Sequence, residues 1–120
     1  HTIAQLGAES SGGRLLLEGL DNVRRLLGES VDAGVHVLAG TDLVGTPANV
    51  AAEALKLADY GLGPRGAVDA VSVSGLAATG RPHGFEPGTP ANAALFPENP
   101  YDEPGVLAHP VRVIRHGRLV

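Results

Sequence analysis

The sequence predicts an α/β protein that ends in a short β-ribbon region, and three observations lead to this prediction. Apolar residues recur at helical spacing in several segments before residue 80. A run of consecutive apolar residues after the first of these segments is typical of a buried strand. Seven of the nine prolines fall within 81–110, where we expect the helices to end. The 120 residues suffice for one domain but not for a complete eight-stranded β/α barrel, which needs roughly 200 to 250 residues.

The first part of the chain has the pattern of a helix followed by a strand. Leucines and valines spaced three and four residues apart predict a helix over about 14–33, with Ala33-Gly34 at its C-terminal cap. The run 35–39 directly after it predicts a short, fully buried strand. The turn at Ala33-Gly34 that joins the helix to this strand is therefore tight. The strand ends at Gly40-Thr41-Asp42.

Further helices are predicted up to Gly80. Thr46-Pro47 has the pattern of an N-cap followed by a first-turn proline, and predicts a helix over about 47–60. Two more helices are expected near 64–73 and near 74–79. The order of helix, strand and helix is typical of a parallel-sheet protein.

The C-terminal region predicts strands between prolines. Residues 93–96 predict one strand, and residues 111–114 and 118–120 predict two more on either side of a turn at 115–117. We therefore expect a β-ribbon at the end of the chain.

Composition and charge limit the classes of function. Eight arginines and one lysine are scattered through a chain of net charge −4, which argues against nucleic acid as a partner. There is no run of 18 apolar residues, so no membrane span is predicted, and the cytoplasm is the default compartment. The core must be built from Ala, Val and Leu, because only four aromatic residues are present. A chain that begins with His1 and contains no Met is expected to be a piece of a longer protein.

Asp42 is the strongest candidate for chemistry. It follows the carboxyl end of a predicted buried strand, where α/β folds place reactive side chains, and a carboxylate there can ligate a metal or accept a proton from water. The alternative is an aspartate that hydrogen-bonds its own turn or caps the next segment. Spacing alone favours this second role.

A longer pattern resembles the C-terminal portion of the metal-dependent amidohydrolase superfamily, near its imidazolonepropionase-like and prolidase-like branches. The resemblance runs in order over most of the chain. It is carried by Ala33-Gly34-Val35 through Gly40-Thr41-Asp42, Glu53-Ala54-Leu55 through Tyr60-Gly61-Leu62, Ala67-Val68, Ala77, Gly80, Glu86-Pro87-Gly88, Asn99-Pro100 and Val113-Ile114-Arg115-His116-Gly117-Arg118.

This resemblance implies a fold and a division of the chain. The fold would be the C-terminal part of a (β/α)8 barrel over residues 1–80, followed over 81–120 by the C-terminal strands of a small β-sandwich domain. The family commonly has an Ala-Asp pair where this chain has Ala91-Asn92. The family's His-x-His pair, its other barrel histidines and its bridging lysine lie upstream of the matched region, so this chain alone is not expected to assemble the site.

The resemblance also implies an activity. Asp42 would be the last catalytic aspartate of the barrel and would contact a divalent metal, usually Zn²⁺. The enzyme would cleave a C–N (amide-type) bond in a cyclic amide, N-acyl or dipeptide-like small substrate through a metal-activated water. The partners implied are that amide substrate and the remainder of the same enzyme, with self-association into a homo-oligomer left open. The alternative is a free-standing, non-catalytic α/β binding or structural domain.

The other polar residues have simpler explanations. His36 shares strand parity with Asp42 but would lie about 20 Å from it, too far to share a metal, and is expected to be a core or barrel-floor histidine. His83, His109 and His116 are expected at exposed turn positions. The charged residues of the predicted helices, among them Arg24-Arg25, Glu53, Lys56 and Asp59, are expected on solvated faces.

Overall fold

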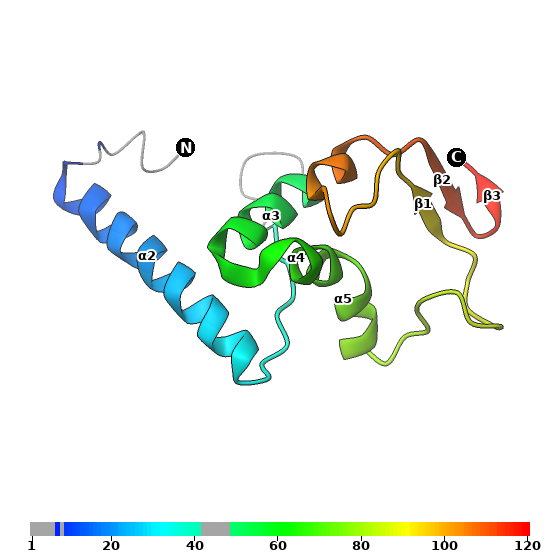
Figure 1. The fold of residues 1–120 in the computed structure, drawn as a ribbon, viewed down its shortest axis with the longest axis horizontal. Coiled ribbons are helices and arrows are strands. Elements are labelled where there is room, and N and C mark those ends of the chain that lie inside the picture. The colour runs from blue at the N-terminus through cyan, green and yellow to red at the C-terminus, as the bar shows by residue number, and fades with distance from the viewer. Residues whose placement is uncertain (1–6, 8, 42–48) are drawn as a thin grey trace.

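The computed structural model of the chain describes residue 7 and residues 9–41 and 49–120. The α-helices lie in the first two thirds of the chain, and a small sheet with one 3₁₀ helix lies in the last third (Figure 1). In chain order the elements are α2 (Ser11–Asp32), α3 (Val50–Leu57), the π-helical turn η1 (Ala58–Leu62), α4 (Gly63–Val71), α5 (Val73–Ala78), β1 (Ala93–Leu95), the 3₁₀ helix η2 (Pro104–Ala108), β2 (Arg112–Arg115) and β3 (Arg118–Leu119).

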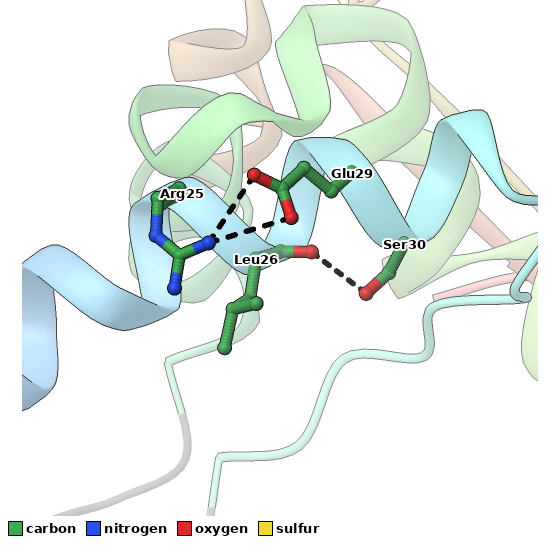
Figure 2. Close-up of polar contacts among 4 residues, drawn as sticks. All are labelled: Arg25, Leu26, Glu29 and Ser30. Atoms are coloured by element: carbon green, nitrogen blue, oxygen red, sulfur yellow. Dashed lines mark hydrogen bonds and ion pairs between the residues drawn. The ribbon is translucent and has the colours of Figure 1, made fainter.

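Helix α2 confirms the helix predicted over 14–33 and begins three residues earlier. Ser10 is its N-cap, and its Oγ accepts a hydrogen bond from the backbone N–H of Gly13 at 3.0 Å. The helix ends where Gly34 takes a φ of +82°, a conformation that glycine adopts readily. On the solvated side, Arg25 pairs with both carboxylate oxygens of Glu29, and the side chain of Leu26, which is 47% exposed, points away from the helix axis (Figure 2).

Helix α2 joins the rest of the molecule through η1, which is the one element it packs against in the described part of the chain. Gly61 makes this contact possible, because its φ of +112° is rarely adopted by other residues. A Cβ at Gly61 would lie 3.3 Å from the backbone oxygen of Arg24. The guanidinium of Arg24 also lies over the ring of Tyr60, 5.0 Å from its centroid. The remainder of α2 projects away from the other helices (Figure 1).

Helices α3 and α4 pack against each other and enclose the core. The buried apolar residues are small: Ala51 and Ala54 from α3, and Ala67, Val68 and Ala70 from α4. Small side chains let helix backbones approach closely, but they bury little apolar area. The predicted helices near 64–73 and 74–79 are confirmed as α4 and α5.

The three strands form an antiparallel sheet in the order β1-β2-β3. Ala93 pairs with Ile114 and Leu95 with Arg112, while Ile114 pairs with Leu119 in the hairpin. The hairpin turn at His116 and Gly117 has φ values of +50° and +75°, as a type I′ turn requires. The β-ribbon predicted at the C-terminus is therefore confirmed.

The predicted fold class is wrong. The described residues contain helices and a small antiparallel sheet, with no parallel β-sheet and no recognisable part of a (β/α)8 barrel or a β-sandwich. Residues 35–39 do not form a strand, because a strand requires a neighbouring strand to satisfy its backbone groups. One backbone hydrogen bond, from the N–H of Ala39 to the oxygen of Ala70 at 3.1 Å, ties this segment to α4 instead. Val35 is 56% exposed and Leu38 47%, so the segment is not buried either.

The helix predicted over 47–60 begins at Val50. Its N-cap is Asn49, whose Oδ1 accepts a hydrogen bond from the backbone N–H of Ala52 at 2.9 Å. Thr46-Pro47, which was expected to cap this helix, lies outside the described residues.

The chain has an elongated shape, with extents of 53 × 32 × 25 Å. Its radius of gyration is 16.6 Å, against roughly 14 Å for a compact domain of this length. Within the described ranges, no helix combines the length and the apolar character needed to span a bilayer.

Candidate functional site

Asp42, the predicted catalytic and metal-binding residue, lies outside the described residues, and the described part of its segment ends at Thr41. The segment before it, 35–41, runs beside α4 and α5. His36 from this segment lines a cavity of about 390 Å³ together with Asp69 of α4 and Ser74 of α5. The structure thus brings a histidine, an aspartate and a serine to one cavity.

These three side chains do not form a catalytic relay. No hydrogen bond joins His36 to Asp69 or Ser74 in the described part of the chain, and such a relay requires the histidine to bond both of its partners. His36 is exposed, so the expectation of a core histidine is wrong. The reason is that the segment around it forms no strand and is not covered by other described elements.

Asp69 has a different partner, Tyr101. The hydroxyl of Tyr101 donates a hydrogen bond to Asp69 Oδ1 at 2.8 Å, between residues 32 positions apart in the sequence. The guanidinium of Arg65, one turn before Asp69 on α4, lies 4.4 Å from the centroid of the Tyr101 ring. The tyrosine is therefore held by α4 at two points.

The environment of Tyr101 keeps its hydroxyl protonated. The hydrogen bond to Asp69 raises the pKa of Tyr101, and burial and the negative charge of Asp69 raise it further, while the positive charge of Arg65 lowers it. A phenol with a raised pKa is a hydrogen-bond donor near neutral pH and a poor general base. The trio of Arg65, Asp69 and Tyr101 thus fastens the segment before η2 to α4.

Beside this trio lies a mainly apolar cavity of about 480 Å³ between α3, α4, β1 and η2. Val68, Phe96, Tyr101 and Leu107 contribute to its lining. A cavity of this kind suits an apolar group.

The described residues do not form a metal site. No group of three or more His, Cys, Asp or Glu side chains among them lies close enough to hold an ion. Asp59 and Lys56 are exposed and Glu53 is half-buried, which agrees with the helix-surface positions expected for them.

Two histidines expected at separate exposed turns line the same cavity. His83 follows α5 and His116 lies in the β2–β3 turn, and both contribute to a cavity of about 490 Å³. Both are exposed, as expected, but their proximity was not predicted.

The Tyr101–Asp69 contact was also missed. The sequence contained one signal for it, because Asn99-Pro100 predicts a turn, and Asn99 Oδ1 does accept a hydrogen bond from the N–H of Tyr101 at 3.2 Å. That signal locates the turn but not the helix it contacts.

Comparison with protein-family models, with curated proteins and with solved structures found no match to this chain.

Proposed function

We propose that this chain is the C-terminal part of a metal-dependent hydrolase that cleaves a C–N (amide-type) bond in a cyclic amide, N-acyl or dipeptide-like small substrate. The chain works together with the remainder of the same enzyme, which supplies the other site residues. Its place of action is the cytoplasm.

The imbalance between core and surface supports the dependence of this chain on further residues. Five apolar residues are buried in the described part of the chain, and four of them are alanines. Seventeen large apolar residues are exposed, including Leu15, Val23, Leu26 and Leu55 on the helices. Complete burial of a fully exposed side chain of this kind contributes about 1.5 to 3 kcal/mol, and these side chains are partly exposed, so a covering partner would gain a fraction of that value at each of them.

The same observation disfavours a free-standing binding domain. A free-standing domain must obtain its stability from its own core, and a core of alanines and one valine supplies little. The exposed apolar residues lie on α2, α3 and α5, on segment 35–39, on the sheet and on the loops, so a covering partner would have to contact much of the surface.

The chemistry of the proposal is supported by Gly40-Thr41-Asp42 and by the ordered resemblance that surrounds it. Asp42 is the residue of this chain to which we assign contact with a divalent ion, Zn²⁺ in the first instance. The remaining ligands are assigned to the rest of the enzyme, because the described residues provide no metal-binding group.

The test compares Asp42→Asn with Asp59→Asn in the natural polypeptide that contains this chain. Hydrolysis is measured on a panel of N-acyl amino acids, cyclic amides and dipeptides, with Zn²⁺ supplied. We expect Asp42→Asn to lower turnover by at least about a hundredfold while the melting temperature stays within about 2 °C, as for loss of a group that acts on the reacting water. Asp59 is an exposed residue of η1, so Asp59→Asn should leave turnover unchanged. Full turnover in Asp42→Asn would refute the assignment.

The dependence on further residues has its own test. The 120-residue chain is expressed alone and together with the remainder of its polypeptide. Alone, we expect it to bind an apolar dye and to melt without a cooperative transition, because its apolar surface is uncovered. A sharp cooperative melt of the lone chain, without dye binding, would instead support the free-standing domain.

A further inference from the structure

The cavity that contains His83 and His116 is lined by basic groups. It lies between the loop after α5, which contributes Arg81 and His83, and the β2–β3 hairpin, which contributes Arg115 and His116. Among the described residues, none that line it carries a carboxylate. The chain as a whole has a net charge of −4. The charge of the arginines at this cavity is therefore opposite in sign to the net charge of the chain.

Hydrogen bonds hold each wall of this cavity to a neighbouring segment: the N–H of Arg81 donates to the backbone oxygen of Leu76 in α5 at 2.9 Å, and the hairpin turn is tied to the residues before β1. Asn92 Oδ1 accepts a hydrogen bond from the backbone N–H of His116 at 2.8 Å. The backbone oxygen of Ala91 accepts a second bond, from the N–H of Gly117 at 2.9 Å. Both of these bonds join residues 91–92 to the turn of the hairpin, so the backbone that carries His116 is held in place beside the sheet.

The two arginines of the cavity are available to a ligand. The described ion pairs involve Arg24 and Arg25 of α2, and neither Arg81 nor Arg115 has a carboxylate partner within 4.0 Å in the described part of the chain. Glu86 lines an adjoining cavity of about 550 Å³, to which Arg81 and His83 also contribute. Guanidinium groups are permanently charged, so the positive charges of Arg81 and Arg115 repel each other unless an anion lies between them.

We propose that this cavity binds a small doubly charged oxyanion, of which inorganic phosphate is the simplest example. The planar fork of an arginine matches two oxygens of such an anion, and two arginines from opposite walls can hold it from two sides. The imidazole ring of His116 supplies a further donor, as does Nε2 of His83, whose Nδ1 lies 3.1 Å from the backbone oxygen of Arg81. This site goes beyond the hydrolase proposed above and does not depend on it.

The test is equilibrium dialysis of the natural polypeptide against inorganic phosphate at low ionic strength. We expect saturable binding of one phosphate per chain. Arg81→Gln and Arg115→Gln should each weaken binding by at least about tenfold, because each removes a charged hydrogen-bond donor from the anion. His116→Asn should weaken it less, and should keep the turn, because asparagine tolerates a positive φ.

The matched control is Arg118→Gln. Arg118 lies on β3 beside Arg115 in the register but is not among the residues that line the cavity, so the same loss of charge should change phosphate binding by less than about twofold. The absence of saturable binding to the unmodified protein would overturn the proposal. An equal loss on Arg118→Gln, or equal displacement by chloride at matched ionic strength, would overturn it as well, since either result indicates nonspecific attraction.

Discussion

Replacing Tyr101 by phenylalanine should loosen the attachment of η2 and the turn before it to α4. The substitution removes one hydroxyl, which donates to Asp69 Oδ1 at 2.8 Å, and leaves the ring over which Arg65 lies. The change is therefore confined to a single hydrogen bond.

The expected magnitude follows from the environment of that bond. A hydrogen bond to a charged group contributes about 1.5 to 3 kcal/mol when it is well buried. Both Tyr101 and Asp69 are half-buried, so water can partly replace the lost partner. We therefore expect a loss of about 1 to 1.5 kcal/mol, which corresponds to a roughly five- to twelvefold increase in local opening.

Hydrogen exchange of backbone amides measures this opening in a protein of any size. The reporters are the amides of Glu103 and Val106, which donate to the backbone oxygens of Asn99 at 3.0 Å and Glu103 at 3.2 Å. A double-mutant cycle with Asp69→Asn isolates the contribution of the pair. Tyr60→Phe is the matched control, because no hydrogen bond of the Tyr60 hydroxyl is found in the described part of the chain.

The stabilisation that the Tyr101–Asp69 hydrogen bond provides depends on pH and decreases at high pH. The pKa of Tyr101 is raised above its ordinary value of 10.0 in the folded chain, chiefly by the hydrogen bond to Asp69. The stabilisation is therefore fully present below pH 10 and is lost as the pH rises through the raised pKa of the folded state. A coupling energy below about 0.3 kcal/mol, or an equal effect of Tyr60→Phe, would refute the reasoning.

Two further substitutions test the packing and the surface of α2. Gly61→Ala should weaken the contact between α2 and η1 by about 1 to 3 kcal/mol, because a φ of +112° is strained for alanine and its Cβ would lie 3.3 Å from a backbone oxygen. Gly19→Ala, within α2 and with open space around it, should instead stabilise the helix by about 0.5 to 1 kcal/mol. Arg25→Gln should change the stability of α2 by no more than about 0.5 kcal/mol, because both partners of the ion pair are more than half exposed. Amide exchange in α2 measures all three changes, and the predictions fail if Gly61→Ala protects the helix or Arg25→Gln unfolds it.

The sequence predicts the elements whose causes are local. Helix α2 follows from leucine and valine spacing, and Gly34 ends it as expected. The hairpin follows from alternating residues around His116-Gly117, whose positive φ values a type I′ turn needs. These features depend on residues within a few positions of one another, which is the range that sequence patterns report.

The features that the sequence missed depend on distant partners. The segment 35–39 has the composition of a strand, but strand structure requires a neighbour that the described chain does not provide. The pairing of Tyr101 with Asp69, and the gathering of Arg81 and Arg115 in one cavity, join residues more than 30 positions apart. The hydrophobic periodicity of a sequence does not indicate which loop contacts which helix.

The prolines beside β1 have a consequence for assembly. Pro90 and Pro97 stand on either side of this three-residue strand, and proline has no N–H to donate to a neighbour. A strand from another molecule could pair with the edge of β1 over very few residues. Such a short edge is a poor template for fibril growth. Aggregation of the chain expressed alone should therefore proceed through its leucine-bearing helices. We expect amorphous aggregates without the cross-β structure of amyloid.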